Sequence, residues 1–235
     1  MNRPAGTVCA SLSGGARFKL LMGELIQLQD RRDDRSRPTR DTRPAFYFDP
    51  GCPLSYLTAE QIERTLGDVE WIPVAATSVC GPRSTGAIDE VRERAEGRAR
   101  ALRLPLVWPD EFPAASPCAL RATAFAAEQG AGARFALAAS RLVFCGGFDL
   151  EDPETLAEAA AAAGISLQAC LQAAGDTTRD ASLAATAHGL RARGVGELPA
   201  FRIGRRWSAG DYALVAAGAM RQDEASFARP LAPVG

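Results

Sequence analysis

The chain has 235 residues, of which 47% are hydrophobic and 23% charged, the composition of an ordinary globular protein. Its formal net charge of -1 argues against nucleic acid as a partner, because a nucleic-acid-binding surface is strongly basic. No apolar run approaches the roughly 20 residues that a membrane span needs, so we expect no membrane partner. The length allows one domain with an insertion, or two small lobes.

The cysteines indicate a reducing environment. They form no C-x-x-C pair and no metal-finger spacing, and the chain has a single histidine, so we predict no metal site. Scattered cysteines in a chain of this length are typical of reduced intracellular thiols, which favours a cytoplasmic location. The six are Cys9, Cys52, Cys80, Cys118, Cys145 and Cys170.

The first 43 residues are predicted to be a disordered extension. Phe18–Leu28 imitates the apolar core of a signal peptide, but Glu24 interrupts it and no clear cleavage site follows. Gln29–Arg43 is almost wholly charged and polar, as in a disordered linker. We therefore expect the folded part to begin near Pro44.

A strand, a tight turn and a helix are predicted around Cys52. Ala45–Asp49 is a short aromatic-rich run of the kind that forms a buried strand, and a Pro-Gly pair then ends it. Pro53 suits the first position of a helix, and apolar residues recur at helical spacing through Leu54–Leu66. Cys52 is thus placed at a helix N-terminus.

That position makes Cys52 the candidate catalytic nucleophile. The helix dipole and the free N–H groups of a helix N-terminus stabilise a thiolate, so we predict a lowered pKa for this thiol. Ser55 either donates a hydrogen bond to the thiolate or bonds only to the backbone. With no second cysteine in the turn, a mixed disulfide on Cys52 must be resolved by an external thiol, unless Cys80 substitutes.

The next segments complete a parallel β-α-β unit and lead into loops. Val69–Ala75 is predicted to be a second strand, with a proline that marks an edge or an irregular end. Thr77–Gly86 is predicted to be a loop, and Ile88–Leu102 to be a charged helix with a solvated face. Leu104–Pro113 contains three prolines and is predicted to be an ordered loop with Trp108 and Phe112 as anchors or as an aromatic lip over a site.

A helical block follows, and then a hairpin and a last helix. Asp152 and Ser166 are predicted N-caps, and the cysteines at 118, 145 and 170 are predicted to be small core residues. A strand at Pro199–Ile203, a turn and a return strand precede a helix that starts at Asp211. The predicted helices of the block are Pro117–Gln129, Ala131–Phe144, Pro153–Ala163 and Leu167–Ala174, and a further helix at about Asp180–Arg193 precedes the hairpin.

This order of elements predicts an α/β protein, a thioredoxin fold with an inserted all-helical domain. We expect residues 44–80 and 186–220 to form the thioredoxin-like domain and residues 81–185 to form the helical insertion. Residues 221–235 are expected to be a tail.

Several motifs resemble one known family. D-P-G-C-P-L-S-Y at 49–56 resembles the active-site turn of the DsbA-like thioredoxin superfamily, where C-P-x-C is usual. L-x-L-P-L-x-W-P-D-x-F-P at 102–113, D-L-x-D-P-E-x-L-A at 149–157 and A-G-I-S at 163–166 resemble its 2-hydroxychromene-2-carboxylate isomerase branch, which is related to the kappa-class glutathione transferases. The resemblance covers about residues 44–220.

The resemblance implies roles for individual residues. Cys52 stands at the position of the attacking cysteine, and Ser55 at that of the resolving cysteine. Leu198-Pro199 matches the segment that contains the family's cis-proline, which faces the active site, although E-L-P at 197–199 replaces its G-V-P. Gly210 and Asp211 resemble an element whose aspartate holds the γ-glutamyl end of glutathione. The implied cofactor is therefore glutathione or another low-molecular-weight thiol.

Pro53, Tyr56 and Trp108 are the predicted substrate pocket. The first function we predict is that of a monothiol thiol–disulfide oxidoreductase acting through a mixed disulfide with a small thiol. The alternatives are a glutathione-dependent isomerase or transferase and a redox-inactive binding module. The expected partners are a small-molecule thiol and an electrophilic or disulfide substrate, and a homodimer stays open because this architecture is often dimeric.

Overall fold

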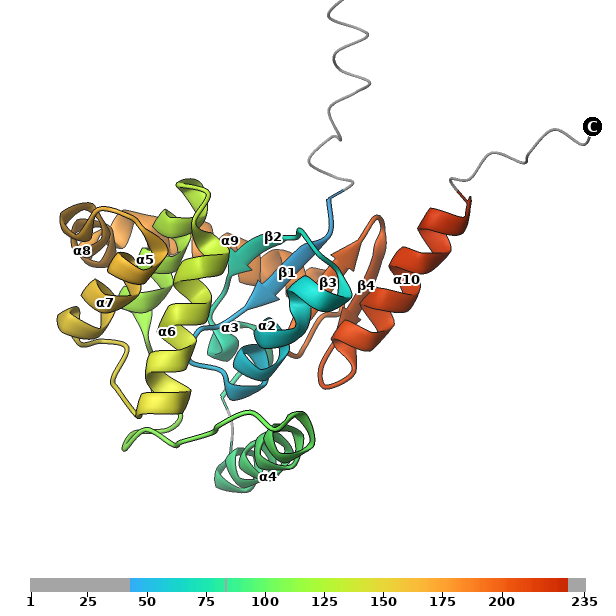
Figure 1. Ribbon diagram of the computed structural model, residues 1–235, viewed down its shortest axis with the longest axis horizontal. Helices are drawn as coiled ribbons and strands as arrows, with labels where there is room; N and C mark the ends of the chain where they lie inside the picture. The colour runs from blue at the N-terminus through green and yellow to red at the C-terminus, as the bar shows by residue number, and fades with distance from the viewer. Residues whose placement is uncertain (1–42, 83, 228–235) are drawn as a thin grey trace, which may run out of the picture. The chain divides into compact units, whose positions relative to one another are not determined.

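Strands from both ends of the folded chain form one mixed sheet in the order β2-β1-β3-β4 (Figure 1). β1 (Ala45–Phe48) pairs in parallel with β2 (Glu70–Pro73) and antiparallel with β3 (Ala200–Ile203). β3 then turns back into β4 (Arg206–Ala209) as an antiparallel hairpin. The predicted parallel unit and the predicted hairpin are both confirmed, and β2 with its proline lies at an edge of the sheet.

The computed structural model describes residues 43–82 and 84–227, all of which belong to one compact unit. The predicted extension of residues 1–43 lies outside the described residues except for its last position, so it stays a prediction. None of the described helices combines the length and the apolarity that a membrane crossing requires.

The central strand β1 is buried along its whole length because both of its faces are covered. The rings of Phe46 and Phe201 stack at 4.9 Å on one face, where Phe48 joins the same apolar cluster. On the other face Tyr47 packs against Trp207, with ring centroids 5.3 Å apart. A strand covered on both faces needs apolar residues at every position, which explains why A-F-Y-F does not alternate.

Ten helical elements surround the sheet within the described residues. The helices of the insertion, α5 to α8, form a block of their own beside the sheet (Figure 1). In chain order they are α2 (Pro53–Thr65), α3 (Ala76–Cys80), α4 (Thr85–Leu102), α5 (Pro117–Glu128), α6 (Gly132–Gly146), α7 (Pro153–Ala163), α8 (Leu167–Gly175), the 3-10 turn η1 (Thr177–Arg179), α9 (Asp180–Ala192) and α10 (Ala213–Phe227).

Helix α2 lies between the sheet and the helical block. Its N-terminal residues, including Leu54 and Leu57, belong to the apolar core of the block, which also contains residues of α4 to α8. Its later residues Ile62 and Leu66 pack in the core of the sheet. The N-terminus of α2, with Cys52, is therefore placed where the two parts of the fold meet.

The fold class and the order of elements agree with the sequence prediction, with two differences. Ala76–Cys80 forms a short helix where a loop was predicted, and α10 continues to Phe227 through the start of the predicted tail. The predicted caps are confirmed: the Asp152 side chain accepts from the N–H of Glu154, and the Ser166 hydroxyl accepts from a backbone N–H in α8.

Candidate functional site

Cys52 is the N-cap residue of α2, with extended backbone angles that turn the chain from β1 into the helix. Its N–H donates to the carbonyl of Asp49 at 3.0 Å, and its own carbonyl accepts from the N–H of Tyr56, also at 3.0 Å. Pro53 occupies the first turn of the helix. The strand, turn and helix predicted from the sequence are present, but Cys52 is only 6% exposed.

Burial raises the pKa of the Cys52 thiol, and the nearby Asp49 carboxylate raises it further. The N–H and hydroxyl of Ser55 and the N–H of Leu54 act in the opposite direction, because they donate to the sulfur and stabilise the thiolate. The predicted lowering of this pKa is therefore wrong for the structure described here. The N–H groups of the helix N-terminus lower the pKa of Cys52 as expected, but the loss of solvation raises it by more.

Asp49 is a buried carboxylate in the same turn, and the sequence analysis assigned it no role. One oxygen accepts from the N–H of Gly51 at 2.8 Å, and the other accepts from the N–H of Ala76 at 2.7 Å. Burial raises the pKa of Asp49, while these two N–H groups lower it. The turn before Cys52 and the start of α3 thus hold one acid group beside the thiol.

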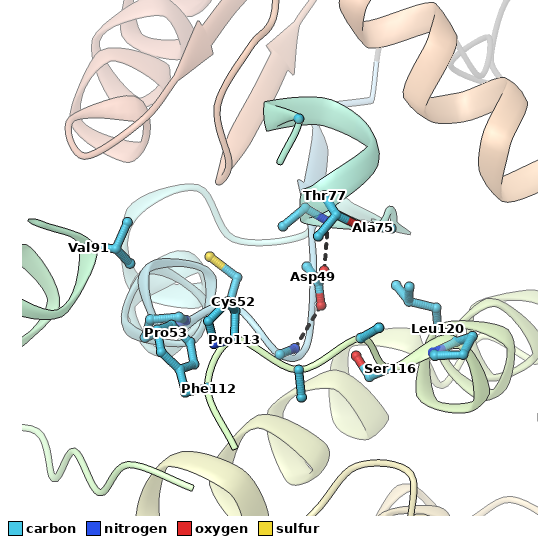
Figure 2. Close-up of a pocket in the computed structure, with 16 residues that line it drawn as sticks. Asp49, Cys52, Pro53, Ala75, Thr77, Val91, Phe112, Pro113, Ser116 and Leu120 are labelled. Carbon is cyan, nitrogen blue, oxygen red and sulfur yellow. Dashed lines mark hydrogen bonds between the residues drawn. The ribbon is translucent and has the colours of Figure 1, made fainter. Parts of the chain in front are cut away.

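A cavity of about 280 Å³ opens beside Cys52 (Figure 2). Its walls come from the Cys52 turn, the start of α3, helix α4 and the loop that leads into α5. Asp49 is the single charged residue among the described residues that line it, and most of the others are apolar. The lining residues are Asp49, Gly51, Cys52, Pro53, Ala75, Ala76, Thr77, Gly81, Val91, Phe112, Pro113, Ala114, Ala115, Ser116, Pro117 and Leu120.

Two of the three predicted pocket residues do not line this cavity. Pro53 does, but the Tyr56 ring stacks on Phe144 and its hydroxyl donates to the carbonyl of Pro105 at 3.1 Å. Tyr56 therefore packs in the core of the helical block.

Trp108 lies outside the cavity wall rather than over the thiol. Its Nε1–H donates to Glu96 at 3.1 Å, and its ring packs against Phe112 with centroids 4.8 Å apart. Phe112 itself lines the cavity, so the aromatic lip of the loop is Phe112, supported from behind by Trp108.

A charged cluster of α4 and the 197–211 segment lies near Cys52. Arg94 of α4 pairs with both carboxylate oxygens of Asp211, at 2.7 and 2.6 Å, and Arg98 donates to the carbonyl of Asp211. The hydrogen bond to Asp211 raises the pKa of Arg94, and negative charge on Glu197 and on a Cys52 thiolate raises it further. The predicted solvated face of this helix thus includes two arginines that contact the site, a role that only tertiary packing brings about.

The predicted thiol-binding segment is placed next to the end of β1. The Leu198–Pro199 bond is cis, as the resemblance implied, and the carbonyl of Pro199 accepts from the N–H of Gly210 at 2.9 Å. Tyr47 pairs with Ala200 in the sheet, so Pro199 lies beside the strand end that leads to Cys52.

None of Leu198, Pro199, Gly210 and Asp211 lines the cavity. The carboxylate of Asp211, predicted to hold an amine, is occupied by Arg94 instead. The cluster of Arg94, Arg98, Glu197 and Asp211 thus forms a charged side of Cys52 that is distinct from the apolar cavity, whereas Leu198 is buried in the apolar cluster beside Tyr47.

The cysteines among the described residues are all free thiols. Cys80 packs beside the apolar cluster on the outer face of β1, and it does not line the cavity. Cys170 is buried as predicted, but Cys145 is exposed, so the prediction that it is a core residue is wrong.

A family model for the DSBA-like thioredoxin domain matches residues 45–226. The chain belongs to this family. The match includes both Cys52 and Asp211, and so spans the two ends of the site. No curated protein matches the chain.

Solved structures share the fold at low sequence identity. A 2-hydroxychromene-2-carboxylate isomerase superimposes with a TM-score of 0.65 at 16% identity, covering 79% of this chain and 99% of that one. A probable DsbA oxidoreductase from Streptomyces coelicolor gives 0.63 at 18%, with 82% and 93% covered. The cytosolic disulfide reductase DsbM from Pseudomonas aeruginosa, solved with GSH, gives 0.57 at 18%, with 78% and 98% covered.

Proposed function

We propose that this DsbA-like protein is a monothiol thiol–disulfide oxidoreductase that works through a mixed disulfide between Cys52 and glutathione or a similar small thiol. The observation that carries the proposal is the position of Cys52 at the N-terminus of α2, with Ser55 and not a second cysteine one turn along. Such a site forms one covalent bond to a small thiol and needs an external thiol to break it.

The exchange proceeds in two balanced steps. The Cys52 thiol gives up its proton and its sulfur attacks a disulfide; a new S–S bond forms as the old one breaks, and the other half of the disulfide leaves as a thiolate that takes up a proton. A second small thiol then attacks the mixed disulfide and releases the Cys52 thiolate. Ser55 donates to the Cys52 sulfur whenever it carries negative charge.

In this proposal the charged ends of the small thiol bind on the charged side of Cys52. Arg94 and Arg98 offer positive charge there, and the backbone beside the cis-Pro199 lies along the same side. Asp211 and Arg94 are already paired with each other, so we assign a carboxylate of the thiol to Arg98, whose guanidinium donates to the backbone carbonyl of Asp211 and not to its carboxylate. The cytosolic disulfide reductase DsbM from Pseudomonas aeruginosa, which shares this fold, was solved with GSH, and this supports a small peptide thiol as the ligand.

One observation favours the isomerase or transferase alternative. The cavity beside Cys52 is largely apolar, which suits an aromatic or otherwise uncharged substrate more than a peptide disulfide. The third alternative, a redox-inactive binding module, predicts that Cys52 takes part in no reaction.

Oxidised glutathione tests the proposal directly. We expect the reduced protein to gain one glutathione adduct, located on Cys52 by peptide mass mapping and removed by a second thiol. Cys52→Ser should abolish this adduct, whereas Cys145→Ser, which changes the exposed cysteine, should leave it intact. An adduct confined to Cys145, or none at all, would refute the proposal and favour the binding module.

A further inference from the structure

The cavity and the charged side of Cys52 suit different ligands. Glutathione carries charged groups at both ends at neutral pH, and each needs a counter-charge or water when it is bound. Among the described residues that line the cavity, the sole charged group is Asp49, a carboxylate already bonded to two N–H groups. The described walls of the cavity therefore offer no positive charge to the carboxylates of a peptide thiol.

The size and walls of the cavity favour a small apolar compound. Its volume of about 280 Å³ is at the lower end of the range for small-molecule sites. Val91, Phe112, Pro113 and Leu120 supply apolar walls from three separate segments. In Figure 2 the Cys52 sulfur, the Asp49 carboxyl and the Ser116 hydroxyl are drawn among these walls.

Cys52 and Asp49 together supply a nucleophile and a proton acceptor. A thiol that is kept neutral by burial must lose its proton as it reacts, so it needs a base, and Asp49 lines the same cavity as Cys52. Asp49 is held for this role by two elements, since its oxygens are fixed by the N–H groups of Gly51 and Ala76.

We propose that the cavity binds a small, uncharged α,β-unsaturated carbonyl compound and that the Cys52 sulfur itself adds to it, with the Asp49 carboxylate as proton acceptor. The inference rests on the proposed role of Cys52 as the nucleophile. It differs from the oxidoreductase and from the glutathione-dependent alternative because no separate thiol cofactor takes part in the addition.

The addition involves no oxidant or reductant. The sulfur forms a bond to the β-carbon, the C=C π bond breaks, and its electron pair passes to the carbonyl as an enolate. The thiol proton goes to Asp49 and then to the α-carbon, which completes the addition. The Ser116 hydroxyl, buried in the cavity wall beside Gly51, is a donor available to the carbonyl oxygen.

Two maleimides, one uncharged and one charged, test the substrate class on the full chain. N-ethylmaleimide is uncharged, whereas 3-maleimidopropionate has the same reacting ring and carries a carboxylate at the end of its N-substituent. At each cysteine we compare the reaction rate with N-ethylmaleimide to the rate with 3-maleimidopropionate. We expect this ratio of rates to be about tenfold greater at Cys52 than at the exposed Cys145, because the described walls of the cavity offer a carboxylate no counter-charge. Equal preferences at the two cysteines would overturn the proposed substrate class.

Asp49→Asn tests the proton acceptor. We expect N-ethylmaleimide to react with Cys52 about 100-fold more slowly at pH 7 in this variant, the lower range for a positioned base. If Asp49 acted only through its charge, the variant would react faster, because removing that charge lowers the pKa of Cys52. Asp110→Asn, an exposed carboxylate on the neighbouring loop, is the control, and an unchanged rate at Cys145 shows that the variant is folded.

The outcomes separate this inference from the proposed function. A Cys52 that forms the glutathione adduct but resists N-ethylmaleimide would overturn the inference and leave the oxidoreductase standing. A Cys52 that reacts with neither reagent would overturn both.

Discussion

The two sides of Cys52 differ in what they offer a ligand. On one side four charged residues lie close together: Arg94 forms an ion pair with Asp211, Arg98 donates to the carbonyl of Asp211, and Glu197 acts on Arg94 through its charge. On the other side the cavity presents apolar walls and one buried carboxyl, that of Asp49. A charged ligand keeps its counter-charges on the first side, whereas an uncharged one gains by leaving water on the second.

The difference shows that one sulfur can have two distinct partners. Helix α4 takes part in both sides, because Val91 lines the cavity and Arg94, three residues later, pairs with Asp211. Residues three apart lie on neighbouring positions of one helical face, so the boundary between the two environments runs along α4. Each side can therefore be changed by a substitution that leaves the other in place.

The largest expected effect comes from filling the cavity. Ala115→Trp should slow the reaction of N-ethylmaleimide with Cys52 by about 100-fold, because the added ring occupies the space that the reagent needs. The reaction with oxidised glutathione should change little, since its charged ends lie on the other side. Ala101→Trp, on the exposed surface of α4, is the matched control. Equal losses with both reagents would show that the two sides are one site.

Removing Arg94 should slow the reaction of Cys52 with oxidised glutathione more than its reaction with N-ethylmaleimide. Arg94→Ala takes away a positive charge near Cys52 and the partner of Asp211, so exchange with oxidised glutathione should slow by about tenfold at low salt. Mixed-disulfide formation followed by mass spectrometry gives the rate. Arg94→Lys should restore part of it, and Arg100→Ala, an exposed arginine of the same helix, should have no effect. A larger loss with N-ethylmaleimide than with glutathione disulfide would contradict the assignment.

Local signals made the strand, the turn and α2 predictable from the sequence. The Pro-Gly pair ends β1 and Pro53 begins the helix, and both effects depend only on neighbouring residues. The helix α3 was missed because A-T-S-V-C is too short to show a helical period and contains residues common in turns.

The site was predictable only in part, for a physical reason. A helix N-terminus lowers a thiol pKa locally, but the burial that raises the pKa of Cys52 comes from distant segments that no spacing reveals. The same holds for Asp49, whose second N–H partner lies 27 residues away, and for the ion pair of Arg94 with Asp211, 117 residues apart. An acid three residues before the cysteine was the one available signal for Asp49.

Asp49, the buried acid of the cavity, should also make the stability of the protein depend on pH. The raised pKa of Asp49 means that the folded protein keeps this proton at pH values where the unfolded chain has released it. Stability due to this group is therefore complete below the ordinary aspartate pKa, about 3.9, and is lost as the pH rises toward the folded value. Asp49→Asn should remove this slope, which is at most about 1.4 kcal/mol per pH unit.

Urea unfolding from about pH 4 to about pH 8 measures the slope, with Asp110→Asn as the control that should keep it. A wild-type protein whose stability rises over that window, with the variant flat, would show that the carboxylate is stabilised and not destabilised by its surroundings.

The smallest expected effect concerns the support behind the cavity wall. Trp108→Phe keeps a ring against Phe112 but loses the hydrogen bond to Glu96, an exposed contact that contributes about 0.5 to 1 kcal/mol at most. The reaction of N-ethylmaleimide with Cys52 should therefore change by no more than about twofold to fivefold, and glutathione exchange should not change. Glu96→Gln removes only the charge at the same contact and should have a similar or smaller effect. If Trp108→Phe instead reduced the reaction as strongly as Ala115→Trp does, Trp108 would have to reach into the cavity itself, and the wall would then be formed by the tryptophan and not by Phe112.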